Sequence, residues 1–192
     1  MVIGNKSNFA IEFGITKACV EPGQLALGFF TIHIKNCRYG VYKPDVTMLA
    51  CSFDKVHQRI LQRGKHVAHF ATEPEASKIA VAFRNAVYSP DHEKEEFFGL
   101  PQTNFSELFD SNGLTWAPGD EAFDDSSYVL HFDIENRVRL IGFTCDQGHD
   151  YSPLTLREVY LEADEFYKIL QNWCEAFDAE RKAALKRQDG RQ

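Results

Sequence analysis

The chain has 192 residues, a net charge of −7 and 44% hydrophobic residues, among them 16 Phe, 7 Tyr and 2 Trp. This length predicts one domain over residues 1–192, and the aromatic content excludes a chain too polar to form a core. No run reaches the roughly 20 apolar residues of a membrane helix, and the N-terminus lacks the apolar stretch of a signal peptide. We therefore expect a soluble cytoplasmic protein that does not bind membranes.

The cysteines are odd in number, scattered, and never spaced as CxxC. In a chain without a secretory signal, such cysteines are free thiols packed as small apolar groups. The sequence therefore predicts neither a zinc site nor a disulfide framework. The five positions are Cys19, Cys37, Cys51, Cys145 and Cys174.

Acidic residues are concentrated in the middle of the chain. Residues 1–90 carry 11 basic and 6 acidic side chains, whereas residues 91–135 carry one basic and 12 acidic side chains. Residues 136–192 are nearly balanced, with 9 basic and 10 acidic side chains. A block of this kind repels nucleic acid and attracts basic partners.

Alternating apolar residues predict strands at residues 8–15 and 25–35, joined as a hairpin. Residues 36–39 suit a turn, and residues 46–51 (VTMLAC) suit a third strand. A helix is then predicted from Lys55 to Gln62, with Ser52 or Asp54 as its N-cap and Gly64 just after its end.

A second helix is predicted after Pro74, with Thr72 as its N-cap, because proline is favoured at the start of a helix. Ile79, Phe83 and Val87 would line one side of it. The alternative for this stretch is a strand over residues 79–83.

Residues 89–125 form an acidic, irregular segment. Three prolines and three glycines interrupt it, so long regular elements are not expected, although a short helix fits residues 105–109. Aromatic residues spread through the segment predict that it is pinned to a core and is not a free linker.

The C-terminal third shows the clearest periodicity. Residues 128–134 alternate as expected for a half-buried strand, and residues 138–142 suit the second strand of a hairpin. Glu135-Asn136 suits the turn between them. A third short strand fits residues 156–160, and a long amphipathic helix begins at Asp164. Its apolar stripe consists of Phe166, Ile169, Leu170, Trp173 and Phe177.

These elements predict an α+β fold. Its mainly antiparallel sheet would be built from the N-terminal and C-terminal hairpins, with the long C-terminal helix packed on it and one or two further helices. The polar, basic residues from Arg181 onward, and above all the tail at residues 186–192, are expected to fray.

The search for catalytic or metal chemistry gives only weak signals. His66 and His69 are three apart but lack a third ligand, and no phosphate-binding glycine motif occurs. His33 and His131 could pair with a cysteine, but structural histidines are the more frequent case. Arg59, Arg63 and Lys65 could contact RNA only as an isolated basic group without a motif. The carboxylate pairs Asp120-Glu121 and Asp124-Asp125 suit docking to a basic partner better than catalysis.

Three stretches resemble the bacterial immunity 42 family of polymorphic and contact-dependent toxin systems. They are IGNKSNFAIEF (3–13), YVLHFDIENRVRLIGF (128–143) and LREVYLEADEFYKILQNW (156–173). The resemblance implies a small α+β protein, without enzyme activity or cofactor. It would bind and neutralise, inside the producing cell, a toxin domain encoded beside it.

We expect the acidic segment to contact the toxin, for which a nuclease with a basic face is one candidate. The lack of a nucleic-acid-binding motif and the overall acidity argue against nucleic acid as a direct partner. Two alternatives stay open: a small Cys/His-dependent hydrolase and a generic protein-interaction domain. The predicted toxin-binding residues are Asp91, Glu93, Glu95, Glu96, Asp110, Trp116, Asp120, Glu121, Asp124 and Asp125.

Overall fold

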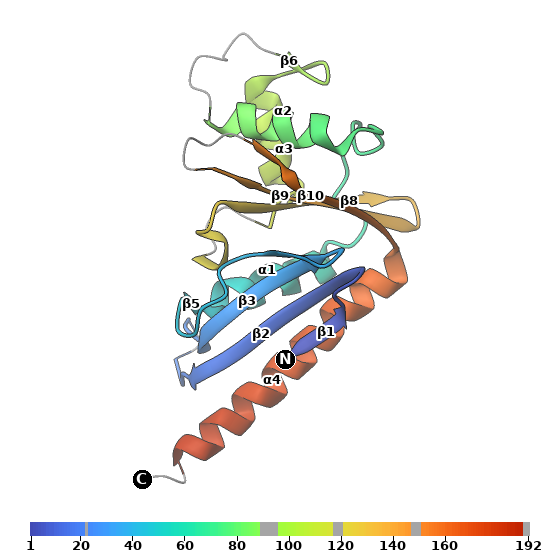
Figure 1. The fold of residues 1–192 in the computed structure, drawn as a ribbon. Coiled ribbons are helices and arrows are strands. Elements are labelled where there is room, and N and C mark those ends of the chain that lie inside the picture. Colours follow the sequence, from blue (N-terminus) through green and yellow to red (C-terminus); the bar gives the residue numbers. More distant parts are fainter. Residues whose placement is uncertain (22, 89–95, 117–120, 147–150, 190–192) are drawn as a thin grey trace.

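A computed structural model describes residues 1–21, 23–88, 96–116, 121–146 and 151–189 (Figure 1). It confirms the predicted α+β class, with antiparallel strands and a long C-terminal helix. The two predicted hairpins, however, form two separate sheets and not one (Figure 1).

The N-terminal sheet contains the first predicted hairpin. Its strand order is β1-β2-β3-β4, and β5 also pairs with β3. Antiparallel pairing of β2 with β3 confirms the hairpin, with Phe9 opposite Ile34 and Phe13 opposite Phe30. The strand bounds are β1 Val2–Asn5, β2 Phe9–Ala18, β3 Ala26–Ile34, β4 Cys37–Tyr39 and β5 Thr47–Met48.

Two local predictions in this region are wrong. The turn predicted at residues 36–39 is confined to Lys35 and Asn36, which have positive φ angles, and β4 follows at once. The strand predicted at residues 46–51 is limited to β5, because helix α1 (Leu49–Leu61) begins directly after it.

Helix α1 starts earlier than predicted because its apolar spacing is helical from Leu49 onward. Leu49 and Val56 are buried seven residues apart, and neither Ser52 nor Asp54 caps the helix. The N-cap is Met48, whose N–H donates to the carboxylate of Glu121 at 3.4 Å. Gly64 lies just past the helix with φ +81°, as expected of a glycine that follows a helix end.

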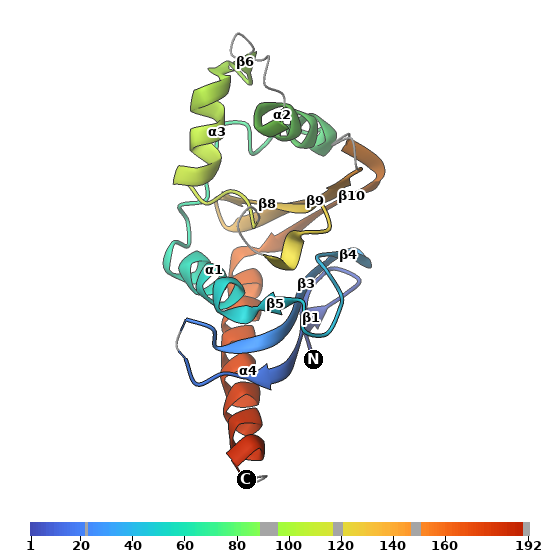
Figure 2. The same cartoon turned by 90° about the vertical axis from the view of Figure 1, so that its left-hand side faces the viewer.

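Helix α4 (Ala163–Asp189) and helix α1 cover one face of the N-terminal sheet (Figures 1 and 2). The predicted stripe of α4 makes this contact: the ring of Trp173 lies 5.8 Å from Phe13, 5.2 Å from Phe30 and 6.1 Å from Phe53 of α1. Aromatic packing of this kind adds about 0.5–1.5 kcal/mol per pair beyond area burial.

The end of α4 differs from the prediction of a frayed tail. The helix continues to Asp189, so residues 186–189 are helical, whereas residues 190–192 lie outside the described part. Arg181 explains part of this order, because its guanidinium donates to the carbonyls of Leu25 at 2.8 Å and Cys19 at 2.6 Å.

The C-terminal sheet has the order β10-β9-β8 and contains the second predicted hairpin. Ser127 pairs with Thr144 and Ile134 with Arg137, which confirms the turn at Glu135-Asn136. The third strand is longer than predicted and carries an irregularity between Ser152 and Arg157. The strand bounds are β8 Ser127–Ile134, β9 Arg137–Cys145 and β10 Tyr151–Glu162.

Strand β8 is buried on both faces, not on one as its alternation predicted. Helices α2 (Ala76–Tyr88) and α3 (Gln102–Ser111) cover one face of this sheet, and α1, α4 and the N-terminal sheet cover the other (Figure 2). The polar side chains of the second face are therefore removed from water and need partners inside the protein.

Both helices expected in the middle of the chain are present, and α2 and α3 form the upper layer of the molecule in Figure 1. α2 begins at Ala76, two residues after Pro74, and excludes the alternative strand over residues 79–83. α3 contains the predicted turn at residues 105–109 and follows a short hairpin of β6 (Glu96–Phe97) and β7 (Leu100–Pro101).

One hydrophobic cluster includes side chains from both large sheets and from the four α-helices of the described residues. Within the described ranges, no helix combines the length and apolarity needed to span a membrane.

Candidate functional site

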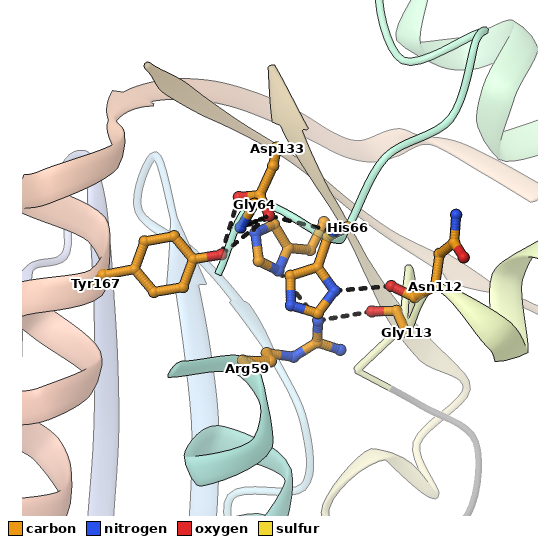
Figure 3. A network of polar contacts seen from close by, with 8 residues as sticks. Arg59, Gly64, His66, Asn112, Gly113, Asp133 and Tyr167 are labelled. Carbon is orange, nitrogen blue, oxygen red and sulfur yellow. Dashed lines mark hydrogen bonds and ion pairs between the residues drawn. The ribbon is translucent and has the colours of Figure 1, made fainter. Parts of the chain in front are cut away.

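The face of β8 that packs against α1 and α4 holds a network of buried polar side chains (Figure 3). His131 and Asp133 lie two residues apart on this face, His131 fully buried and Asp133 8% exposed. Buried polar groups in folded proteins are almost always hydrogen-bonded. Their partners come from α1, from the loop after it, and from α4.

Asp133 is the acceptor at the centre of this network. Its carboxylate accepts from the backbone N–H groups of Gly64 at 2.8 Å and His66 at 3.2 Å, and from the Tyr167 hydroxyl at 2.8 Å. Burial alone would raise its pKa, but contacts with His131, Tyr167 and the His66 N–H outweigh burial and lower the pKa to about 2.

His131 lies between Asp133 and a buried arginine, Arg59. The Arg59 guanidinium donates to Nδ1 of His131 at 3.0 Å, and guanidinium groups do not accept, so the imidazole proton is on Nε2. That nitrogen lies 3.3 Å from the Asp133 carboxylate. Burial, with the nearby Arg59 charge, lowers the pKa of His131 to about 3, so the imidazole is neutral at pH 7.

Arg59 also holds the loop that follows α3. Its guanidinium donates to the carbonyl of Gly113 at 2.8 Å and that of Thr115 at 2.5 Å, and lies 4.4 Å from the ring centre of Trp116. Lys55, one turn earlier on α1, donates to the Trp116 carbonyl at 3.0 Å. Two cations of α1 therefore fix the backbone that leads into residues 117–120.

The loop after α1 holds the same region from the other side. His66 Nδ1 donates to the Asn112 carbonyl at 2.8 Å, and the Asn112 side-chain amide donates to the Val67 carbonyl at 2.8 Å. The network thus joins α1, α4, β8 and the end of α3 into one rigid unit. Three of its buried nitrogens, Arg59 Nε, His66 Nε2 and His131 Nε2, make no hydrogen bond within the described residues, but its other contacts connect elements of the fold, which indicates a structural joint.

The histidines considered for metal or nucleophilic chemistry make structural contacts. His66 and His69 lie in irregular backbone, not on one helical face, and His69 bonds to the Phe98 carbonyl. Among the described residues, no group of three His, Cys, Asp or Glu side chains is placed to hold a metal ion. His33 pairs with Glu12 at 2.9 Å. The five cysteines, all within the described ranges, are free thiols, but only Cys145 is buried and Cys51 is exposed, so the expected packing as small apolar groups holds only in part.

The basic group considered for RNA is not one surface. Arg59 is 5% exposed and directed into the protein. Arg63 pairs with Asp164 of α4 at 2.5 Å and lies over the Tyr167 ring. These two arginines connect elements of the fold.

The predicted toxin-binding residues fall in different places. Glu96 lies in β6 at the outer end of the upper layer (Figure 1), and Asp110 lies at the end of α3. Glu121 lies in the short 3-10 helix η1 (Glu121–Phe123), and Asp124 and Asp125 follow it. All five of these carboxylate side chains are exposed. The positions that lie outside the described residues are Asp91, Glu93, Glu95 and Asp120.

The acidic residues at η1 do not share a surface element with Glu96. η1 contacts β3 and β5 of the N-terminal sheet, and the Val41 N–H donates to the Ala122 carbonyl at 2.7 Å. β6 instead contacts α3 and β7. The described acidic residues therefore form separate groups on the two layers.

Trp116 differs from the other predicted contact residues because it is only 1% exposed. Its ring stacks on Phe30 at 6.2 Å and lies under the Arg59 guanidinium. Trp116 therefore anchors the segment to the core, and we leave it out of the proposed binding surface.

Sequence reasoning missed the joint formed by Arg59, His66, Asp133 and Tyr167. The signal was present in β8, where His131 and Asp133 alternate with large apolar residues. Alternation alone assigns such residues to the solvent face, and only the cover by α1 and α4 shows that they are buried.

The geometry defines an α+β protein whose interior polar residues join two layers and which exposes the described carboxylates of its acidic segment. The sequence model of the family described as immunity protein 42 matches residues 1–176, so the chain belongs to this family and is an immunity protein. Family membership implies a non-enzymatic role.

A solved structure, CdiI from Burkholderia dolosa AUO158, has a similar fold, with a TM-score of 0.56. It is 15% identical in sequence, and the similarity covers 92% of this chain and 99% of that chain. No curated protein matches the sequence.

Proposed function

We propose that this protein neutralises, inside the producing cell, a toxin domain encoded beside it by binding that domain tightly through its acidic segment. Membership of the immunity protein 42 family carries this proposal. The block of 12 acidic and one basic side chain at residues 91–135 supports the choice of segment.

The way this segment is held also supports it. On one side of residues 117–120, Arg59 and Lys55 fix residues 113–116. On the other side, the Ala122 carbonyl accepts from Val41 N–H, and Glu121 accepts from Met48 N–H. The described residues on the two sides of this gap are therefore preorganised, and preorganised residues lose less conformational entropy on binding, which favours affinity.

The charge of the segment favours a toxin domain with a basic face, and a nuclease is the candidate class. An acidic surface would occupy the site of the nucleic-acid backbone. Opposite charges also speed the encounter between two proteins.

The direct test uses the domain encoded next to this gene. Bacteria that express the domain alone should stop growing, and co-expression of this protein should restore growth. The two purified proteins should form a stable complex in size-exclusion chromatography. A generic interaction domain predicts neither rescue nor complex formation, and that pair of results would refute the proposal.

A further inference from the structure

An apolar cleft opens between α2, α3 and β8 in the upper layer. Its volume is about 340 Å³, and its inner wall is formed by Phe83, Phe109 and Tyr128. Val87, Tyr88 and Asp110 also line it, and each of these three side chains is solvent-exposed.

The inner wall of the cleft is rigid. The Phe83 ring lies 4.8 Å from Phe109 and 5.6 Å from Tyr128, and all three side chains are buried in the core. The Tyr88 hydroxyl is hydrogen-bonded to the Tyr128 hydroxyl, which fixes α2 against β8. The shape of the cleft is therefore set before anything binds.

The mouth of the cleft exposes apolar surface to water. Val87 is 48% exposed and Tyr88 is 36% exposed, although both lie beside buried aromatic rings. A partner that covered this surface would gain the hydrophobic free energy that the isolated chain leaves unused.

The charge at the cleft indicates the chemistry of its partner. Among the described residues that line it, Asp110 carries the only charge, and it belongs to the strongly acidic part of the chain. The volume is at the small end of the range of about 300–1,000 Å³ for ligand pockets, and the inner wall is mainly aromatic. These properties suit one large apolar side chain with a basic group beside it.

We infer that this cleft is the anchor pocket of the toxin interface. It receives one aromatic or branched aliphatic side chain of the toxin domain, and Asp110 pairs with a lysine or arginine next to that side chain. This inference rests on the proposed function. A single buried anchor in a preformed pocket is the usual form of an interface hot spot.

Two pairs of matched variants test the inference by measuring affinity and association rate for the purified toxin domain. Ser106→Trp fills the cleft from α3, and Thr103→Trp places the same side chain on an exposed position of α3 that does not line it. Asp110→Lys reverses the charge at the cleft, and Glu175→Lys makes the same change at an exposed position of α4, outside the acidic segment.

Ser106→Trp should weaken binding by about 30-fold or more, as loss of a hot spot does. Asp110→Lys should slow association by about tenfold. Both control variants should bind within about twofold of the unmodified protein. If the unmodified protein binds and Ser106→Trp binds equally well, the inference is overturned while the proposed function stands. If the unmodified protein does not bind, the proposed function itself fails.

Hydrogen exchange of the unmodified complex gives a second test that does not depend on any variant folding. Complex formation should slow amide exchange at residues 83–88 and 105–110. Protection confined to other segments would overturn the inference. Self-association of the free chain that Ser106→Trp abolishes, without an effect on toxin binding, would also overturn it, because the occupant would then be a second copy.

Discussion

His131 and Asp133 are polar residues on a strand face that the fold covers completely. Each is matched to a specific partner: Arg59 donates to His131, and Tyr167 donates to Asp133. Removing one member leaves a buried partner without its hydrogen bond, which costs about 1–3 kcal/mol. At the scale of residues, these four side chains connect α1, β8 and α4.

The low pKa of His131 predicts how stability depends on pH. An unfolded imidazole binds a proton near pH 6.5, whereas folded His131 does so only near pH 3. Between these values the unfolded state binds more protons, so the stability contribution present above pH 6.5 is lost as the pH falls toward 3. Burial also lowers the pKa of His33 and of His66, which act in the same direction.

His131→Gln should therefore reduce the pH dependence of the free energy of unfolding. Between pH 6.5 and 4, the slope should decrease by about 1.4 kcal/mol per pH unit, the value for one proton. Urea unfolding followed by the fluorescence of the buried Trp116 and Trp173 measures it. Gln58→Ala, at an exposed position of α1, is the control and should keep the original slope. Equal slopes for all three proteins would contradict the assignment.

At the scale of elements, β4 connects the two sheets through Tyr39. The Tyr39 side chain is fully buried, and its hydroxyl donates to the carbonyl of Thr155 at 2.6 Å and lies 3.1 Å from the carbonyl of Gly142. Its ring packs directly on Gly142 of β9, where a Cβ atom would lie 2.4 Å from the ring. The short strand β4 thus depends on a glycine about one hundred residues away along the chain.

Gly142→Ala should destabilise the protein by about 2 kcal/mol or more, because the Tyr39 ring has no space to move away. Gly23→Ala is the matched control, since an added Cβ there meets no atom within 4 Å, and it should change stability by less than about 0.5 kcal/mol. Thermal unfolding of the two variants provides the comparison. Equal melting temperatures would show that the sheets are not joined tightly at this point.

At the scale of the whole molecule, the acidic residues divide between two layers. Glu96 and Asp110 belong to the upper layer, and Glu121 and Asp124 lie against the N-terminal sheet. The joint around Arg59 and Asp133 keeps the layers in a fixed relation. A toxin that contacted both groups would therefore meet a preformed arrangement of charge.

Association with the toxin domain should depend on salt, because exposed charges are screened beyond about 8 Å at physiological ionic strength. Glu121→Lys combined with Asp124→Lys should lower the association rate by about tenfold at low salt and flatten its salt dependence. Glu175→Lys combined with Asp178→Lys changes the net charge equally, at exposed positions of α4, and should have a smaller effect. Stopped-flow mixing at several salt concentrations distinguishes the pairs. Equal rates would exclude the η1 group from the interface.

The spacing of apolar residues along the sequence was sufficient to predict much of the architecture. The β2–β3 and β8–β9 hairpins, the stripe of α4 and the α+β class follow from which residues are apolar and at what spacing. The start of α1 was misassigned, because VTMLAC suits a strand and a helix equally in a short window. The acidity of the middle of the chain was also evident from the sequence, because net charge follows from the residue types alone.

Only the tertiary structure decided which faces are covered and which residues share a surface. Alternation in β8 predicts one buried face, but the packing of α1 and α4 on the second face converts His131 and Asp133 into interior residues. The same packing buries Trp116 and separates Glu96 from Glu121. The physical reason is that burial depends on contacts between elements distant in sequence, whereas periodicity records only the preference of each element by itself.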